Sequence, residues 1–176
     1  GLDSYIRLYV GESAGKDTGR VFAVIASDSF ATMSANDQRT TEEPALIESR
    51  SHLNTVRSLG PRVLLKAVRF DGTHAGAWLF NTRIVATDEP GYLNALNDLR
   101  KLLDDRGLKD IKINTYRVVA GRDTYTHLVS LNAPSSERLA LMMDTMVTDA
   151  GIGGWIAGSA KFRTVVNNGT YREITP

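Results

Sequence analysis

The stretch that decides the fold runs from Gly76 to Thr175, and its most regular part is PGYLNALNDLRKLLDDR, Pro90–Arg106. Apolar side chains recur there every three or four residues, at Tyr92, Leu96, Leu99 and Leu103. This spacing places them in one stripe along a helix. Asp88 can cap the start of that helix, and Gly107 is a typical stop. The segment therefore predicts a helix whose apolar stripe packs against a sheet.

Strand signals flank this helix on both sides. Alternating or β-branched apolar residues predict four strands, at Ala77–Ala86, Ile111–Ala120, Thr124–Leu131 and Gly169–Thr175. The two middle strands are expected to join at a tight turn, Gly121-Arg122-Asp123, and a second helix is expected over Ser136–Ala150. The order strand, helix, strand, strand, helix, strand is the ferredoxin-like unit, βαββαβ.

The segment before Gly76 repeats part of this pattern. Ile6–Gly11 is similar to Tyr116–Gly121, and Arg20–Asp28 is similar to Thr124–Asn132. A helix predicted over Pro44–Leu59 follows, and then a further strand. We infer a complete ferredoxin-like repeat at residues 75–176 and an incomplete one at residues 1–74, which lacks its opening strand and helix. Chance similarity between two common hairpin-plus-helix segments is the alternative.

Composition excludes several kinds of site and partner. The chain of 176 residues has no cysteine, which excludes disulfides and thiolate metal sites. Its formal net charge of +1 gives no reason to expect nucleic acid or an anionic membrane as a partner. No apolar run approaches the roughly 20 residues of a membrane span. The chain begins Gly-Leu-Asp without Met, so both a cytoplasmic protein and a periplasmic or secreted protein that has lost a signal peptide fit the sequence.

A short hairpin motif, Gly-x-Asp-Thr, occurs in both halves, at residues 15–18 and 121–124, and each copy precedes a strand that runs into a capped helix. This pattern resembles the dimeric α/β-barrel superfamily, which includes antibiotic-biosynthesis-monooxygenase-like, NIPSNAP-like and stress-responsive barrel proteins. The resemblance implies an α+β fold in which ferredoxin-like repeats form a dimeric-α/β-barrel-like body of packed antiparallel sheets. It also implies a cavity for a small-molecule ligand and allows self-association, but it implies no single reaction, and we expect no cofactor.

The alternation of side chains along the predicted strands indicates a candidate site. Asn81 and Arg83 share one face of their strand, opposite the apolar face that we expect the helices to cover. We expect the ligand-binding residues on this cavity side to be Asn81, Arg83, Arg117, Arg7 and Tyr5. His127 and Tyr125 are the candidate catalytic residues on the same side, with His127 as a general base near neutral pH. The alternative is a solvated polar face whose long side chains reach water.

Three other features favour ordinary structural roles. The three histidines are far apart and lack the spacing of metal ligands, so no metal site is expected. Gly151–Gly154 follows a helix and not a strand, which indicates a flexible joint and not a phosphate-binding turn. Asn168-Gly169 begins a glycosylation sequon but is also a preferred turn pair, and we interpret it as a turn.

Three functions remain open at this point. The first is a small-molecule-binding or accessory barrel protein. The second is a cofactor-independent monooxygenase-like enzyme that acts on a polar aromatic or polyketide-like compound. The third is a structural module that pairs its sheet with another chain. A fold of this kind hosts many functions, so the site and not the fold has to decide among them.

Overall fold

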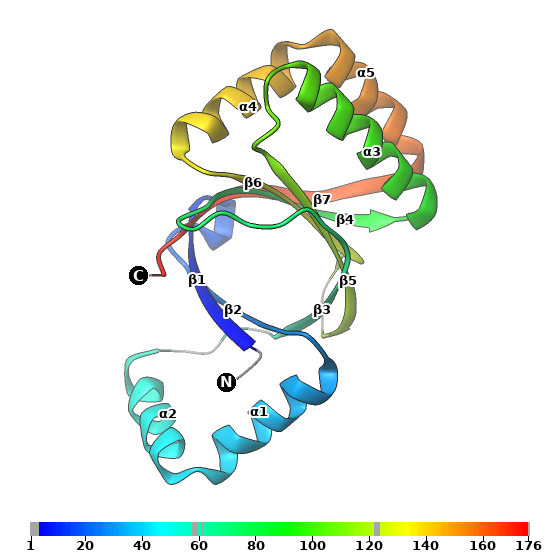
Figure 1. Ribbon diagram of the computed structural model, residues 1–176. Helices are drawn as coiled ribbons and strands as arrows, with labels where there is room; N and C mark the ends of the chain where they lie inside the picture. Colours follow the sequence, from blue (N-terminus) through cyan, green and yellow to red (C-terminus); the bar gives the residue numbers. More distant parts are fainter. Residues whose placement is uncertain (1–3, 58–59, 61, 122–123, 176) are drawn as a thin grey trace.

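Seven antiparallel strands form one continuous, strongly curled sheet in the computed structural model, which describes residues 4–57, 60, 62–121 and 124–175 (Figure 1). The strands are β1 Ser4–Ser13, β2 Val21–Ser27, β3 Val63–Phe70, β4 Trp78–Ala86, β5 Lys112–Gly121, β6 His127–Ala133 and β7 Arg163–Glu173. Their order across the sheet is β2-β1-β7-β4-β6-β5-β3. The helices are α1 Phe30–Glu42, α2 Pro44–Val56, α3 Glu89–Asp105, α4 Ser136–Thr148 and α5 Ala150–Ser159.

This single half-barrel sheet corrects the expected fold. The prediction of ferredoxin-like repeats that form a dimeric-α/β-barrel-like body of packed antiparallel sheets is wrong, because no second sheet faces the first within the described residues. Strands of the first half instead extend the sheet of the second half sideways. β1 pairs with β7 and β3 pairs with β5, so both outer strands of the second half gain hydrogen-bonded neighbours. Lateral pairing satisfies the backbone N–H and C=O groups that an open edge leaves free.

The helix expected around Pro90–Arg106 is confirmed as α3. The Asp88 side chain caps its start by accepting a hydrogen bond from the Gly91 amide at 3.0 Å. Gly107 follows its end with a φ of 72°, a conformation that glycine adopts without steric cost. The four residues of the predicted apolar stripe are all buried: Tyr92, Leu96, Leu99 and Leu103.

The main hydrophobic core lies between the outer face of the sheet and the layer formed by α3, α4 and α5 (Figure 1). Ile84 of β4 is fully buried there, and Phe80 packs against the same cluster. The helices therefore cover the face of β4 opposite Asn81 and Arg83, as expected, and Trp78 packs on the same side. A second, smaller cluster occupies the concave face and consists of Tyr9, Ala14, Ala77, Leu79 and Tyr171, with Phe22 beside it.

Two boundaries in the second half differ from the prediction. Gly151–Gly154 is not a joint but lies inside α5, whose N-terminal cap is Asp149, bonded to the Ile152 amide at 2.9 Å. β7 begins at Arg163, so Asn168-Gly169 lies in the middle of a strand and forms no turn. Packing of the buried Ile152 and of Trp155 in the core outweighs the low helix propensity of the glycines. The expected turn at Gly121-Arg122-Asp123 falls on residues 122–123, outside the described residues.

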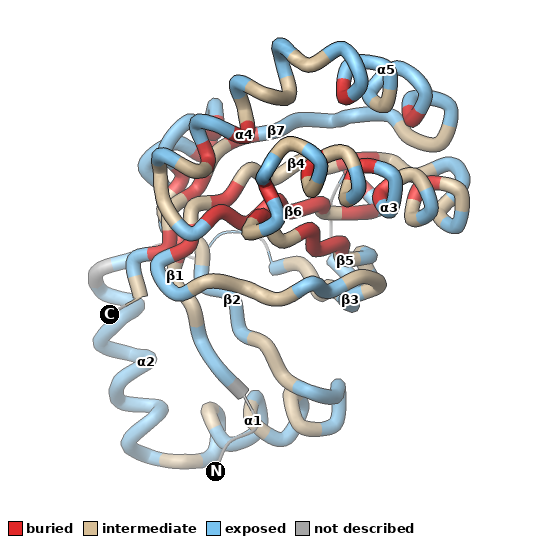
Figure 2. Tube along the Cα trace, turned by 45° about the horizontal axis from the view of Figure 1, so that its top comes forward, coloured by how far each residue is buried: buried red, intermediate tan, exposed pale blue. Residues whose placement is uncertain are grey.

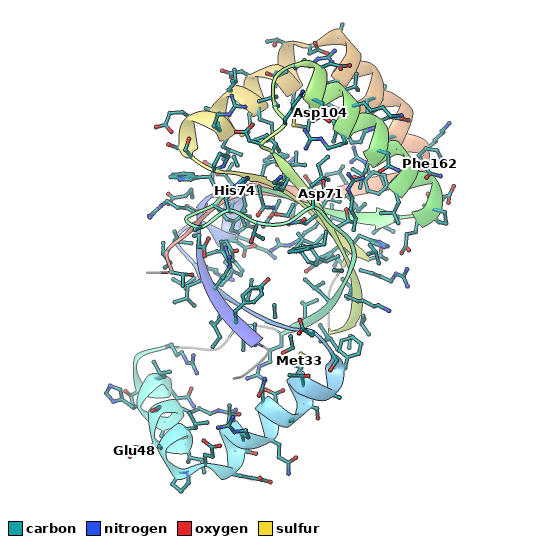
Figure 3. The ribbon with its side chains drawn as sticks, in the orientation of Figure 1. Met33, Glu48, Asp71, His74, Asp104 and Phe162 are labelled. Atoms are coloured by element: carbon teal, nitrogen blue, oxygen red, sulfur yellow. The ribbon has the colours of Figure 1, made fainter. Side chains whose placement is uncertain are left out.

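The α1–α2 hairpin lies at the opposite end of the molecule from α3, α4 and α5 (Figures 1 and 2). α1 has no buried residue, and Figure 2 shows both helices as exposed or half-buried along their length. Met33 on α1 and Glu48 on α2 are labelled in Figure 3, well away from the main core. The helix predicted over Pro44–Leu59 is observed as α2, and residues 58–59 lie outside the described part. The proposed division at residues 74 and 75 stays a prediction.

Candidate functional site

A cavity of about 310 Å³ opens where the start of β1 meets the end of β7. It is lined by Tyr5, Ile6, Arg7, Ala75, Gly76, Glu173 and Thr175. Tyr5 and Arg7 are two of the predicted ligand-binding residues, and the structure brings them together here. They alternate with Tyr9 of the concave-face cluster, so all three side chains share the concave face of the sheet.

Arg7 and Glu173 form the polar wall of this cavity. Arg7 Nη1 lies 3.0 Å from Glu173 Oε2 and also donates a hydrogen bond to the carbonyl oxygen of His74 at 3.0 Å. The Glu173 side chain is only 5% exposed and accepts a second hydrogen bond from the Ala77 amide at 3.2 Å. The Arg7 guanidinium also lies 5.4 Å from the centre of the Tyr5 ring. The pair is therefore fixed on both sides, and its two charges cancel locally.

Two tyrosines that interact electrostatically with this ion pair, Tyr9 and Tyr116, have raised pKa values. Burial raises the pKa of Tyr9, and the negative charge of Glu173 raises it further. Burial also raises the pKa of Tyr116 far above its usual value, with smaller contributions from Tyr5 and Tyr9. Both phenols therefore stay protonated at neutral pH and can donate hydrogen bonds.

A second polar group lies farther along the concave face and contains Arg83 and Asn81. Arg83 Nη1 lies 3.0 Å from Asp17 Oδ2, and its guanidinium is 5.6 Å from the centre of the Tyr125 ring. Asp17 is only 6% exposed, so this ion pair is also largely buried. Asn81 pairs with Ser130 across the sheet, and its Oδ1 atom is buried without a hydrogen-bond partner among the described residues. Neither Arg83 nor Asn81 lines the 310 Å³ cavity.

His127 and Arg117 lie on the other face of the sheet, which corrects the expected shared cavity. His127 Nε2 is 2.6 Å from Glu89 Oε2, at the start of α3. Arg117 donates to both oxygens of the same carboxylate, with Nε 2.7 Å from Oε2. In β6, His127 lies on the same face as Val129 and Leu131, and both of these belong to the main core under the helices. The candidate base is therefore separated from the cavity by the sheet itself.

Tyr125 and His127 also do not share a face, although they are two positions apart, a spacing that places side chains on one face of a regular strand. β6 begins only at His127, so Tyr125 lies outside the strand and the strand alternation does not apply to it. The Thr126 amide donates to the Ile84 carbonyl, while the Val118 amide donates to the Thr126 carbonyl. This irregular pairing lets Tyr125 approach Arg83 on the concave face. The catalytic roles of His127 and Tyr125 stay predictions.

The Glu89 carboxylate holds His127 and Arg117 together on the outer face of the sheet. The hydrogen bond from Arg117 is the main reason that the pKa of Glu89 is low, and His127 lowers it further, against the opposing effect of burial. Because an ionised carboxylate only accepts hydrogen bonds, Nε2 of His127 must carry a hydrogen and donate it. Nδ1 of the same ring lies 2.9 Å from Thr126 Oγ1. The imidazole is therefore oriented on both sides.

The sequence did not point to Glu173, which bonds to Arg7, or to Glu89, which bonds to both Arg117 and His127. Strand alternation could have found Glu173, because it follows Tyr171 at a spacing of two in β7. Glu89 carried only the general signal of an acidic residue in a first helical turn. No local pattern links it to Arg117 or His127, which come from two other strands.

The described residues hold no cluster of three or more His, Asp or Glu side chains that could bind a metal ion. None of the described helices combines the length and the apolar character that crossing a lipid bilayer requires. Comparison of the sequence with protein-family models and with curated proteins found no match.

Proposed function

We propose that the protein binds a small, uncharged, polar aromatic molecule in the cavity between β1 and β7. The observation that carries this proposal is the placement of the Arg7–Glu173 pair in the wall of the 310 Å³ cavity, next to a half-exposed tyrosine ring. The volume suits a small organic molecule, since ligand pockets start at roughly 300 Å³.

The charge of the cavity wall favours a neutral ligand. Arg7 offers N–H donors and Glu173 offers acceptor oxygens, but their charges compensate each other at 3.0 Å. A charged ligand would have to compete with this existing ion pair and would lose its own hydration. A neutral molecule that carries both a donor and an acceptor can bond to the pair without separating it.

The Tyr5 ring supplies the apolar part of the site. Tyr5 is 48% exposed, which leaves much of its ring free of protein contacts. Aromatic rings bind one another in offset or edge-to-face arrangements and contribute about 0.5–1.5 kcal/mol beyond the area they bury. A planar aromatic ligand could therefore pack on Tyr5 and direct its polar groups toward Arg7 and Glu173.

The test uses 4-hydroxybenzamide as a neutral probe and 4-hydroxybenzoate as its anionic analogue, each titrated into the protein while backbone amide NMR shifts are followed. We expect saturable shifts at Tyr5, Arg7, Ala75 and Gly76 at millimolar concentration, with the amide binding more tightly. Tyr5→Ala and Arg7→Met should each weaken binding several-fold. Phe30→Ala is the matched control, because Phe30 on α1 is also 48% exposed but lies outside the cavity.

Two results would overturn this proposal. Absence of saturable shifts at the cavity residues with both probes would remove it as a binding site for this class. Tighter binding of the benzoate, or equal weakening by Phe30→Ala and Tyr5→Ala, would show that the assumed recognition by the ion pair and the ring is wrong.

A further inference from the structure

A second cleft, with a volume of about 450 Å³, lies on the outer side of the molecule between the end of β3, α3 and the segment that leads into β5. It is lined by Arg69, Asp71, Arg100, Asp104, Lys109 and Lys112. Figure 3 labels Asp71 just after β3 and Asp104 on α3. Four basic and two acidic side chains line the cleft, which leaves two positive charges in excess. Nothing in the proposed function uses these residues.

The two arginines are rigidly held, and the two aspartates neutralise them. Arg69 Nη1 lies 2.6 Å from Asn97 Oδ1, and its Nη2 lies 3.2 Å from Asp71 Oδ2. Arg100 donates to the carbonyl oxygens of Leu108, at 2.7 Å, and of Ile111, and it pairs with Asp104 at 2.7 Å. The arginine side chains are only 16% and 19% exposed. They therefore form a preorganised wall.

The excess charge belongs to Lys109 and Lys112. Neither lysine forms an ion pair or a side-chain hydrogen bond within the part of the chain that the structure describes. In addition, the Nε atoms of Arg69 and Arg100 are buried without an acceptor among the described residues. Uncompensated N–H groups and free ammonium groups together give the cleft a positive potential that favours an anion.

We infer that this cleft binds a phosphorylated small molecule, with its phosphate group between Lys109 and Lys112. A phosphate monoester carries a charge of about −1.5 to −2 at neutral pH and three acceptor oxygens, which matches two ammonium groups that have no partner among the described residues. The cleft is larger than a single phosphate ion requires, so its remaining space suits the organic part of a monoester. The four fixed charges of the arginine and aspartate pairs then contact polar groups on the organic part of the monoester.

The experiment titrates the full chain with glycerol 3-phosphate, inorganic phosphate and glycerol at constant ionic strength, with backbone amide shifts of residues 109–112 as the readout. We expect saturable binding of glycerol 3-phosphate, weaker binding of inorganic phosphate and none of glycerol. Because the second phosphate pKa is about 6, binding should weaken as the pH falls below that value. Lys109→Gln combined with Lys112→Gln should reduce the affinity by about tenfold or more.

Lys161→Gln is the matched control, since Lys161 is an exposed lysine outside the cleft whose ammonium lies over the Phe162 ring. The inference is overturned if the double variant and the control bind glycerol 3-phosphate equally, or if the shifts do not saturate. Equal affinity for inorganic phosphate and the monoester would reduce the site to a simple anion site. If a single-stranded oligouridylate binds more tightly and this binding depends on the two lysines, the inference is overturned and the ligand class is nucleic acid. The probes of the first cavity carry no phosphate, so either proposal can fail without the other.

Discussion

At the scale of single residues, Glu89 has more contacts than its position suggests. It occupies the first turn of α3, yet it bonds to His127 from β6 and to Arg117 from β5. The sequence identifies the favourable place of a carboxylate near a helix N-terminus. The two strand residues become its partners only because β5 and β6 are neighbours in the sheet.

Glu89→Gln should make the stability of the protein less dependent on pH. The pKa of Glu89 is lower in the folded state than its ordinary value, so its ionisation stabilises the fold above the unfolded-state pKa. That contribution is lost as the pH falls through the lower, folded-state pKa. We therefore expect the variant to be less stable at pH 7 and the difference to shrink steadily in acid.

Urea unfolding of both proteins from neutral to acidic pH measures this effect. Glu48→Gln on α2 serves as the control, because Glu48 forms no ion pair with a described residue and is exposed. A difference for Glu89→Gln that stays constant across the pH range would contradict the assignment.

Gly169→Ala should destabilise the protein by about 1–3 kcal/mol, because overpacking forces backbone shifts. A Cβ atom at this position would lie 2.8 Å from the Ala14 Cα and 3.0 Å from the Ser13 carbonyl oxygen. Both contacts are backbone atoms that cannot rotate away. Gly153→Ala is the opposite case, since no atom of the described residues lies within 4 Å of its Cβ position in α5, and we expect it to stabilise the helix by about 0.5–1 kcal/mol.

Thermal and urea unfolding of these two glycine variants decides between the two interpretations of Asn168-Gly169. A neutral Gly169→Ala would indicate that β1 and β7 are not as close as the structure shows. A turn position, which the sequence suggested, would have no such backbone neighbour.

At the scale of secondary-structure elements, α3 illustrates what local periodicity can predict. Its stripe, its cap and its stop were all predicted, because each depends on residues within one or two helical turns. β7 and α5 were misplaced. The Asn167-Asn168-Gly169 segment in the middle of β7 and the glycines of α5 carry weak or opposing local signals, and tertiary packing overrides them.

Leu96→Ala in α3 should cost about 2–5 kcal/mol of unfolding free energy, because Leu96 is fully buried and its truncation leaves a cavity. Leu141→Ala in α4 should cost much less, because Leu141 is 47% exposed. Urea unfolding of both variants at neutral pH makes the comparison. Similar losses for the two leucines would show that the core between the sheet and α3 is less well packed than the contacts indicate.

At the scale of the whole molecule, stability should follow the order of strands in the sheet. β4 lies between two neighbours and its outer face is covered by the main core, whereas β2 is an edge strand with mostly exposed residues. The α1–α2 hairpin has even less buried surface. Regions with few buried apolar contacts open at lower free energy than the core.

Native-state hydrogen exchange should therefore show the highest protection in β4 and β6 and much lower protection in β2, α1 and α2. This measurement also tests the expected division at residues 74 and 75. If β1 amides open together with those of β7, the sheet is one cooperative unit across that boundary. Protection of α1 equal to that of α3 would contradict the weak packing of the hairpin.

The sequence by itself determined the order of most strands and helices in the second half, the buried stripe of α3 and the helix-covered face of β4. These features depend on periodicity along short segments, which is a local property of the chain. The sequence also predicted Tyr5 and Arg7 as site residues, and both line the first cavity. Their partner Glu173 lies more than 160 residues away, so no local signal could pair them.

Only the tertiary structure decided how the strands pair and which side chains meet. Hydrogen bonds between β1 and β7 and between β3 and β5 connect distant segments, and they produce one curled sheet where two packed sheets were expected. The irregular pairing at Thr126 separates Tyr125 from His127, and the position of α3 brings Glu89 to His127. The face of the sheet on which a side chain lies, and the residues that it contacts, depend on the long-range register of the strands. A single irregularity in a strand is enough to move a side chain to the other face.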